Sequence, residues 1–94
     1  MITGFRDDAT DKVFQEQKSP EFPPDILKRA LAKLQQLHVS QTLNDLRVPP
    51  GNHLEILKGN RAGQHSIRIN NQWRIRFVWT EDNHAAQVEI TDYH

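Results

Sequence analysis

Hydrophobic and polar residues alternate with period two between Ser66 and Trp79, on both sides of a polar break at residues 70–72. One set of alternate positions holds Ile67, Ile69, Trp73, Ile75, Phe77 and Trp79. The other set carries Arg68, Arg74 and Arg76. Such alternation is typical of half-buried strands, and adjacent asparagines favour a turn between them. The sequence therefore predicts a hairpin with one apolar face and one face bearing three arginines.

A second periodicity, of three and four residues, runs from Asp25 to His38. Its apolar positions are Ile26, Leu27, Ala30, Leu31, Leu34 and Leu37. They form one stripe, which predicts a helix packed against the core. Asp8 to Gln17 favours a shorter helix that Asp7 or Asp8 would cap, and a helical turn is expected at Leu43 to Leu46.

Shorter alternations predict further strands at Ile2 to Phe5, His53 to Leu57 and Gln87 to Tyr93. In the middle one, Leu54 and Ile56 would face inward, whereas His53 and Glu55 would face outward. The order of one strand, two helices and four strands predicts an α+β fold, with both helices on one face of a mainly antiparallel sheet. We expect residues 1–94 to form a single domain whose arginine face stays open.

The composition excludes several classes of protein. The chain has 94 residues, 36% of them hydrophobic and 26% charged, which is typical of a soluble globular protein. It has no cysteine, which excludes disulfides, a thiol nucleophile and thiolate metal sites. Its five histidines show no metal-binding spacing, and we expect no metal or cofactor. No apolar run approaches a membrane span and the start does not resemble a signal peptide, so we expect a cytoplasmic protein without a membrane partner.

Charge is unevenly distributed along a chain whose formal net charge is zero. Residues 46–80 hold one acid, Glu55, and a net charge of +5. The six cations are Arg47, Lys58, Arg61, Arg68, Arg74 and Arg76. A local basic zone on a neutral chain indicates an anionic partner bound at a defined place. The alternative is a solvated sheet face whose arginines pair with Asp and Glu.

The residue types expected on or near the open face suit cleavage of RNA. Strand-borne arginines would stabilise the negative charge that develops when a ribose 2′-hydroxyl attacks the adjacent phosphorus. Proton transfer needs a base and an acid. The candidates are His53, Glu55, Asp92 and His94, and Tyr93 offers a ring on which a base could stack.

Several motifs together strongly resemble HigB-type toxins of the RelE/ParE superfamily of bacterial toxin–antitoxin systems. They are the run from Asp45 to Asn52 with its Pro49-Pro50-Gly51-Asn52, then Leu57-Lys58-Gly59-Asn60-Arg61-Ala62-Gly63, Ser66-Ile67-Arg68-Ile69-Asn70, Gln72-Trp73-Arg74 and Asp92-Tyr93-His94. With the element order, the resemblance covers essentially the whole chain.

The resemblance implies an endoribonuclease that enters the ribosomal A site and cuts mRNA without a metal. It also implies a HigA-type helix-turn-helix antitoxin, through which alone the toxin would meet operator DNA. Arg68 and Arg74 match phosphate-facing arginines, and Lys58 and Arg61 match a basic edge. Asp92, Tyr93 and His94 match the carboxy-terminal catalytic group. Some relatives have a catalytic histidine at the position of Glu55, whereas this chain has His53 two places earlier.

Two alternatives use the same fold. A gyrase-poisoning toxin would use the arginine face for protein contact, and an attenuated toxin would act only as an antitoxin-binding corepressor. A nuclease of this kind needs both Arg74 and His94, whereas neither alternative does.

Overall fold

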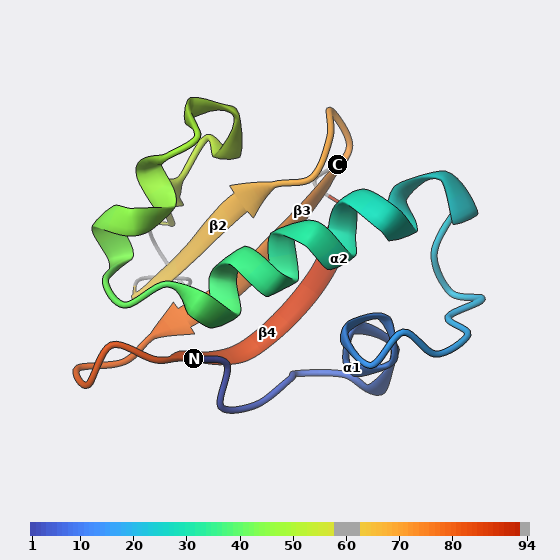
Figure 1. Ribbon diagram of the computed structural model, residues 1–94, viewed down its shortest axis with the longest axis horizontal. Coiled ribbons are helices and arrows are strands. Elements are labelled where there is room, and N and C mark those ends of the chain that lie inside the picture. Colours follow the sequence, from blue (N-terminus) through green and yellow to red (C-terminus); the bar gives the residue numbers. More distant parts are fainter. Residues whose placement is uncertain (58–62, 93–94) are drawn as a thin grey trace.

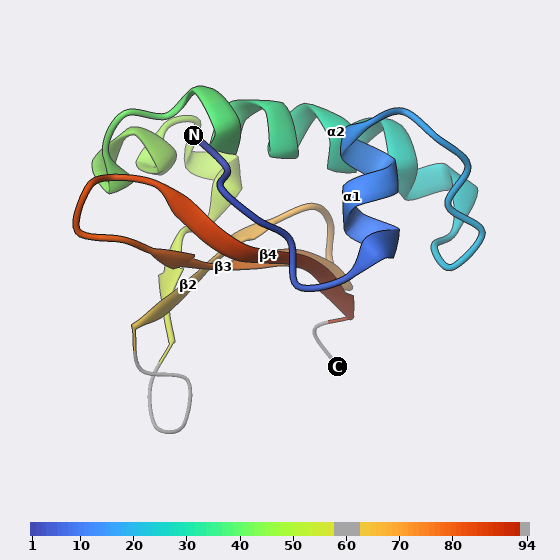
Figure 2. The same ribbon diagram turned by 90° about the horizontal axis from the view of Figure 1, so that it is seen from below.

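The computed structural model describes residues 1–57 and 63–92. Within them, α1 (Asp8–Phe14) and α2 (Pro24–Val39) lie on one face of an antiparallel sheet (Figures 1 and 2). Its strands are β1 (Glu55–Ile56), β2 (Gln64–Arg68), β3 (Trp73–Trp79) and β4 (Ala85–Asp92), in that order across the sheet. Two short 3-10 helices, η1 (Leu43–Arg47) and η2 (Pro50–Asn52), connect α2 to β1. The predicted α+β arrangement, with both helices on one face, is confirmed.

The amino-terminal segment lies along β4 without forming a regular strand (Figure 1). Ile2 and Phe5 make isolated parallel bridges to Ala85 and Val88. The amide of Thr3 donates to the Ala85 carbonyl at 2.8 Å. The predicted strand over residues 2–5 is therefore an extended parallel segment, because its bridges to β4 are separated by unbridged residues.

The helices follow the sequence pattern closely. Asp7 caps α1 by accepting a hydrogen bond from the Thr10 amide at 2.8 Å. This helix ends at Phe14, three residues before the predicted Gln17. The buried positions of α2 are Ile26, Ala30, Leu34 and Leu37, as its apolar stripe predicts. The helical turn expected at residues 43–46 is η1.

The core lies between α2 and the sheet. Ile67, Ile75 and Phe77 are almost completely buried beneath the helices. Trp73 and Trp79 pack against this core, as predicted. Ile56 was expected inside but is 59% exposed. The reason is that β1 is a short edge strand with β2 as its neighbour on one side.

The turns explain the strand register. Asn70 accepts hydrogen bonds from the amides of Gln72 and Trp73, both at 2.8 Å, and so closes the β2–β3 turn. A bulge opposite β3 occurs at Gln87, whose φ is +51°.

Neither of the described helices is both long and apolar enough to cross a membrane.

Candidate functional site

Two cross-strand rows of polar side chains lie on the sheet face opposite the helices. The first, the Glu89 row, consists of Glu55, Ser66, Arg76 and Glu89. The second, the Arg68 row, consists of Arg68, Arg74 and Thr91. Directly paired residues of antiparallel strands point to the same face. The three arginines of the predicted hairpin therefore share one face, which no described helix covers (Figure 2).

Arg74 lies inside a hydrogen-bond network, and its side chain is 7% exposed. Its Nε donates to Ser66 Oγ at 2.8 Å, and its Nη2 donates to the carbonyls of Ser66 and His53. Its Nη1 lies 3.9 Å from Glu55 Oε1. The expectation of an openly exposed guanidinium is wrong for Arg74. The buried Ser66 and the loop before β1 supply acceptors that draw the side chain down onto the sheet.

The backbone at His53 explains how the loop supplies an acceptor. His53 follows η2 and has a left-handed conformation, with φ +43° and ψ +57°. His53 is an exposed residue, and its main-chain carbonyl is the group that contacts Arg74. His53 thus meets the site through its main chain.

Arg76 is also paired, and so departs from the predicted open cation. Its Nε donates to Glu89 Oε1 at 3.2 Å, and a second guanidinium nitrogen contacts the same oxygen. Glu89 Oε2 lies 3.0 Å from Arg6 Nε. The alternative in which arginines pair with acids therefore describes Arg74 and Arg76, because Glu55 and Glu89 lie in the same face.

Arg68 differs from the other two arginines. Its guanidinium donates to the side-chain oxygen of Asn71, a neutral group in the hairpin turn. Across the parts of the chain that the structure describes, no carboxylate pairs with it. Arg68 stands directly opposite Arg74. Because Arg74 lies near Glu55 and no described carboxylate pairs with Arg68, the positive charge of Arg68 remains uncompensated on this row.

Other predicted residues lie elsewhere. Asp92 pairs across the sheet with Trp73, so it points to the helix side rather than toward the Arg68 row. Its carboxylate accepts a hydrogen bond from Gln72 Nε2 at 2.9 Å. Arg47 is exposed at the end of η1. The positions of Lys58, Arg61, Tyr93 and His94 lie outside the described residues.

The comparisons with known proteins identify the family. Residues 3–94 match the family model described as the RelE-like toxin of type II toxin-antitoxin system HigB. The chain belongs to this family of HigB-like toxins. It is similar to Toxin HigB-1 of Vibrio cholerae serotype O1, with 38% identity over 82 residues that cover 86% of each chain. It is also 39% identical to an uncharacterized protein of Haemophilus influenzae, over 92% of this chain and 85% of that protein.

Solved structures share the fold of this HigB-like toxin. The YoeB-YefM complex from Staphylococcus aureus matches with a TM-score of 0.56 and 20% identity, over 100% of this chain and 98% of that chain. YafQ from Escherichia coli matches with a TM-score of 0.53 and 14% identity, over 94% of this chain and 91% of that chain. At these identities the similarity concerns the fold alone.

Asn52 belongs to the Pro-Pro-Gly-Asn motif, to which the sequence pattern assigned no role, and it anchors the loop of this toxin that carries His53. Asn52 is fully buried, and its Nδ2 donates to the Leu46 carbonyl at 3.1 Å and to Gln36 Oε1 at 3.2 Å. Lys33 Nζ donates to its side-chain oxygen. Burial, and then the nearby Arg29, lower the pKa of Lys33 below its usual value. An asparagine after Pro-Pro-Gly is typical of an exposed turn, so the pattern hid this role.

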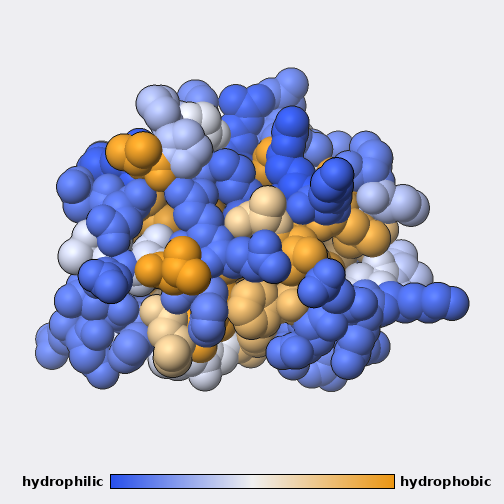
Figure 3. Space-filling model, viewed as in Figure 1, coloured by the Kyte–Doolittle hydropathy of each residue, from blue (hydrophilic) through white to orange (hydrophobic). Residues whose placement is uncertain are grey.

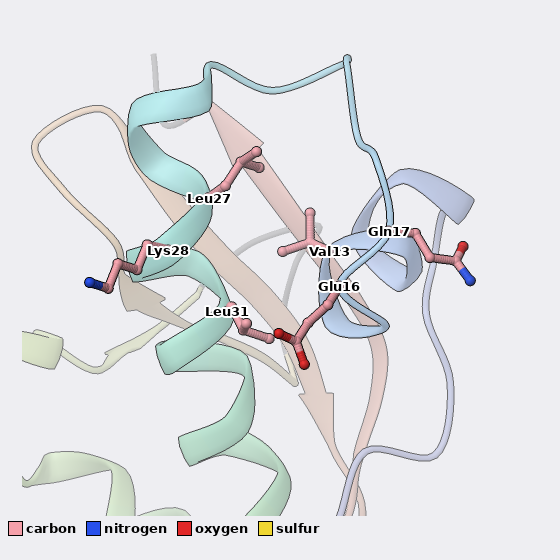
Figure 4. Close-up of a pocket in the computed structure, with 6 residues that line it drawn as sticks. All are labelled: Val13, Glu16, Gln17, Leu27, Lys28 and Leu31. Atoms are coloured by element: carbon pink, nitrogen blue, oxygen red, sulfur yellow. The ribbon is translucent and has the colours of Figure 1, made fainter.

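The helix side of the toxin holds a separate apolar hollow of about 310 Å³ between α1 and α2 (Figure 4). Val13, Leu27 and Leu31 form its apolar part, and Glu16 and Lys28 border it. Figure 3 shows apolar side chains gathered beside α2 on this side of the molecule. The arginine rows lie on the opposite side of the sheet. Among residues 1–57 and 63–92, no group of three or more His, Asp or Glu side chains is placed to hold a metal ion.

Proposed function

We propose that this toxin is an endoribonuclease that cuts mRNA in the ribosomal A site. The observation that carries the proposal is the uncompensated guanidinium of Arg68, directly opposite the buried Arg74 on an uncovered sheet face. A fixed cation on strands can meet a developing oxyanion with little reorganisation. The resemblance to HigB-type toxins supplies the substrate and the ribosomal setting.

In the proposed reaction, the ribose 2′-oxygen attacks the adjacent phosphorus and the bond from phosphorus to the 5′-oxygen breaks. The products are a 2′,3′-cyclic phosphate and a 5′-hydroxyl. A base takes the proton of the 2′-hydroxyl, and an acid protonates the departing 5′-oxygen. Arg68 would stabilise the negative charge on the non-bridging phosphate oxygens.

Glu55 is the described side chain best placed to transfer a proton near these arginines. Its side chain is 41% exposed, and one of its oxygens lies 3.9 Å from Arg74 Nη1. Arg74 in turn acts as a positioning residue, because its hydrogen bonds join Ser66 and the His53 carbonyl beside Glu55. Substrate could therefore reach the Glu55 carboxylate, while Arg74 fixes its position.

The resemblance adds residues to this proposal. Tyr93 and His94 would complete the catalytic group, without Asp92, which faces the helix side of the sheet. Lys58 and Arg61 would contribute a basic edge, and Arg47 and Arg76 further contacts to RNA. The resemblance also supplies the partner, a HigA-type antitoxin that neutralises the toxin in the cytoplasm and carries it to operator DNA.

Mapping mRNA 5′ ends in a translating extract tests the proposal. We expect the wild-type toxin to produce new 5′ ends on ribosome-bound mRNA, and Arg68→Ala and a chain lacking Tyr93-His94 to produce at least about 10²-fold fewer. Lys28→Ala, which removes a cation on the helix side, should cleave like the wild type. A wild-type toxin that stops growth while leaving mRNA intact would contradict the nuclease and favour the gyrase-type alternative.

A further inference from the structure

A second cationic cluster lies on the same sheet face, at the side of β4. It consists of Arg6, Arg76 and Glu89, in which two guanidiniums share one carboxylate and leave a net charge of +1. Arg6 belongs to the amino-terminal segment, and its main-chain amide donates to the Val88 carbonyl at 2.9 Å. The residue types of Arg6 and Glu89 gave no reason to select them, because their meeting depends on the parallel placement of that segment.

The carboxylate lies beneath the two cations. The side chain of Glu89 is 11% exposed, whereas those of Arg6 and Arg76 are 55% and 22% exposed. Arg6 contacts Glu89 through Nε at 3.0 Å, and more than half of its side chain is exposed, so a ligand can reach the guanidinium. A buried carboxylate that holds two guanidiniums reduces their mutual repulsion and fixes their positions. The result is a preorganised pair of donors that faces solvent.

The cluster lies next to the proposed cleavage site, two residues away along β3. Arg74 and Arg76 are two residues apart on β3, so their rows are separated by roughly 7 Å. A single nucleic-acid strand that crosses β3 on this face can therefore present one phosphate to each row. We propose that Arg6 and Arg76, held by Glu89, form a second phosphate-binding subsite for a phosphodiester of RNA. This inference rests on the proposed function for the location of the scissile phosphate.

A purely structural ion pair that fastens the amino-terminal segment to β4 is the competing explanation. The two explanations differ in the expected effect of Glu89→Gln. As a subsite, the cluster gains net positive charge when Glu89 is neutralised, so RNA binding should become tighter. As a fastening, it loses its central ion, so the segment should loosen and binding should not improve.

The experiment measures binding to ribosomes programmed with an mRNA whose A-site codon is 2′-O-methylated and therefore resists this cleavage. We expect Arg6→Ala to bind about 3–10-fold more weakly than wild type. The plot of log affinity against log salt should also become less steep, with a slope smaller in magnitude by about 0.7–0.9, the value for one lost phosphate contact. Arg6→Lys should retain most of the affinity, and Glu89→Gln should bind more tightly than wild type. Thermal unfolding of each variant controls for loss of the fold.

An Arg6→Ala variant with wild-type affinity and salt slope would overturn the subsite, as would a Glu89→Gln variant that binds no more tightly than wild type. Repeating the measurement on ribosomes without mRNA distinguishes the two sources of phosphate. A defect that persists there assigns the subsite to ribosomal RNA, and one confined to programmed ribosomes assigns it to mRNA. Binding does not require cleavage. A wild-type toxin that binds these ribosomes but does not cut unmodified mRNA would therefore end the nuclease proposal and leave the subsite intact.

Discussion

The guanidinium of Arg74 donates to the main-chain carbonyl of His53, a residue 21 positions earlier in the chain. This contact joins β3 to the loop that follows η2, and the same guanidinium holds the side chain of the buried Ser66. Arg74 thereby combines a position on the proposed RNA-cutting face with a role in the packing of the loop.

Replacement of Arg74 should therefore destabilise the fold. Arg74→Ala leaves the His53 carbonyl and the buried Ser66 Oγ without this donor, and an unsatisfied buried group costs about 1–3 kcal/mol. We expect the free energy of unfolding to fall by about 2–4 kcal/mol in urea titrations. Arg68→Ala is the matched control, because its partner Asn71 is exposed, and it should change stability by less than about 0.5 kcal/mol. Equal stability of the two variants would show that the Arg74 network contributes little.

Glu55 offers a test of proton transfer. Glu55→Gln keeps the shape of the side chain but removes its ability to take a proton, so the rate of mRNA cleavage should fall about 10²–10⁴-fold. Binding to programmed ribosomes should change far less than the rate. Glu81→Gln, in the exposed turn after β3, is the control acid and should cleave normally. A Glu55→Gln toxin with an unchanged single-turnover rate would remove Glu55 from the catalytic group.

Asn52 offers a test of how the loop is positioned. Asn52→Ala removes the donor of the Leu46 carbonyl and the acceptor of Lys33 inside the protein. We expect a loss of about 2–4 kcal/mol in the free energy of unfolding, together with faster hydrogen exchange in residues 43–56. Replacement of the exposed Asn44 in η1 by Ala should have little effect on either quantity. Wild-type exchange rates in Asn52→Ala would contradict this anchoring role.

His65 predicts the direction of a pH effect on stability. Its ring stacks on Phe77 with centroids 5.9 Å apart, and burial lowers the pKa of this imidazole below its ordinary value. The unfolded chain, with a histidine pKa of about 6.5, then binds more protons than the folded chain as the pH falls. Stability contributed by neutral His65 is present above about pH 6.5 and is lost below it.

Urea titrations at about pH 8 and about pH 5.5 measure this effect. His65→Gln cannot titrate, so it should lose less stability between the two values than wild type. Parallel losses in the two proteins would show that His65 is not responsible for the pH dependence.

The periodic elements could be predicted because one burial face fixes their pattern. The stripe of α2, the alternation of β2 and β3, and the turn at Asn70 each follow from local spacing. The state of the arginines could not be predicted in this way. Alternation placed Arg74 and Arg76 on the uncovered face, but their pairing depends on the Ser66 and His53 acceptors and on Glu89, which come from other elements.

Asp92 shows a related limit. Its place beside Tyr93 and His94 in the sequence suggested a common role, whereas the β3–β4 register places it opposite Trp73 on the helix side. The bulge at Gln87 and the parallel amino-terminal segment were equally hidden, because both depend on pairing between segments far apart in the chain.

The long-range pairing of β4 has a consequence for biosynthesis. The hydroxyl of Thr10 accepts a hydrogen bond from the amide of Ile90, 80 positions later, and Arg6 depends on Glu89 in the same strand. During vectorial synthesis, residues 1–10 leave the exit tunnel of the ribosome long before this final strand is made. A nascent chain arrested before β4 therefore lacks the Arg6–Glu89 contact, and the cationic surface assembles only after translation of that strand.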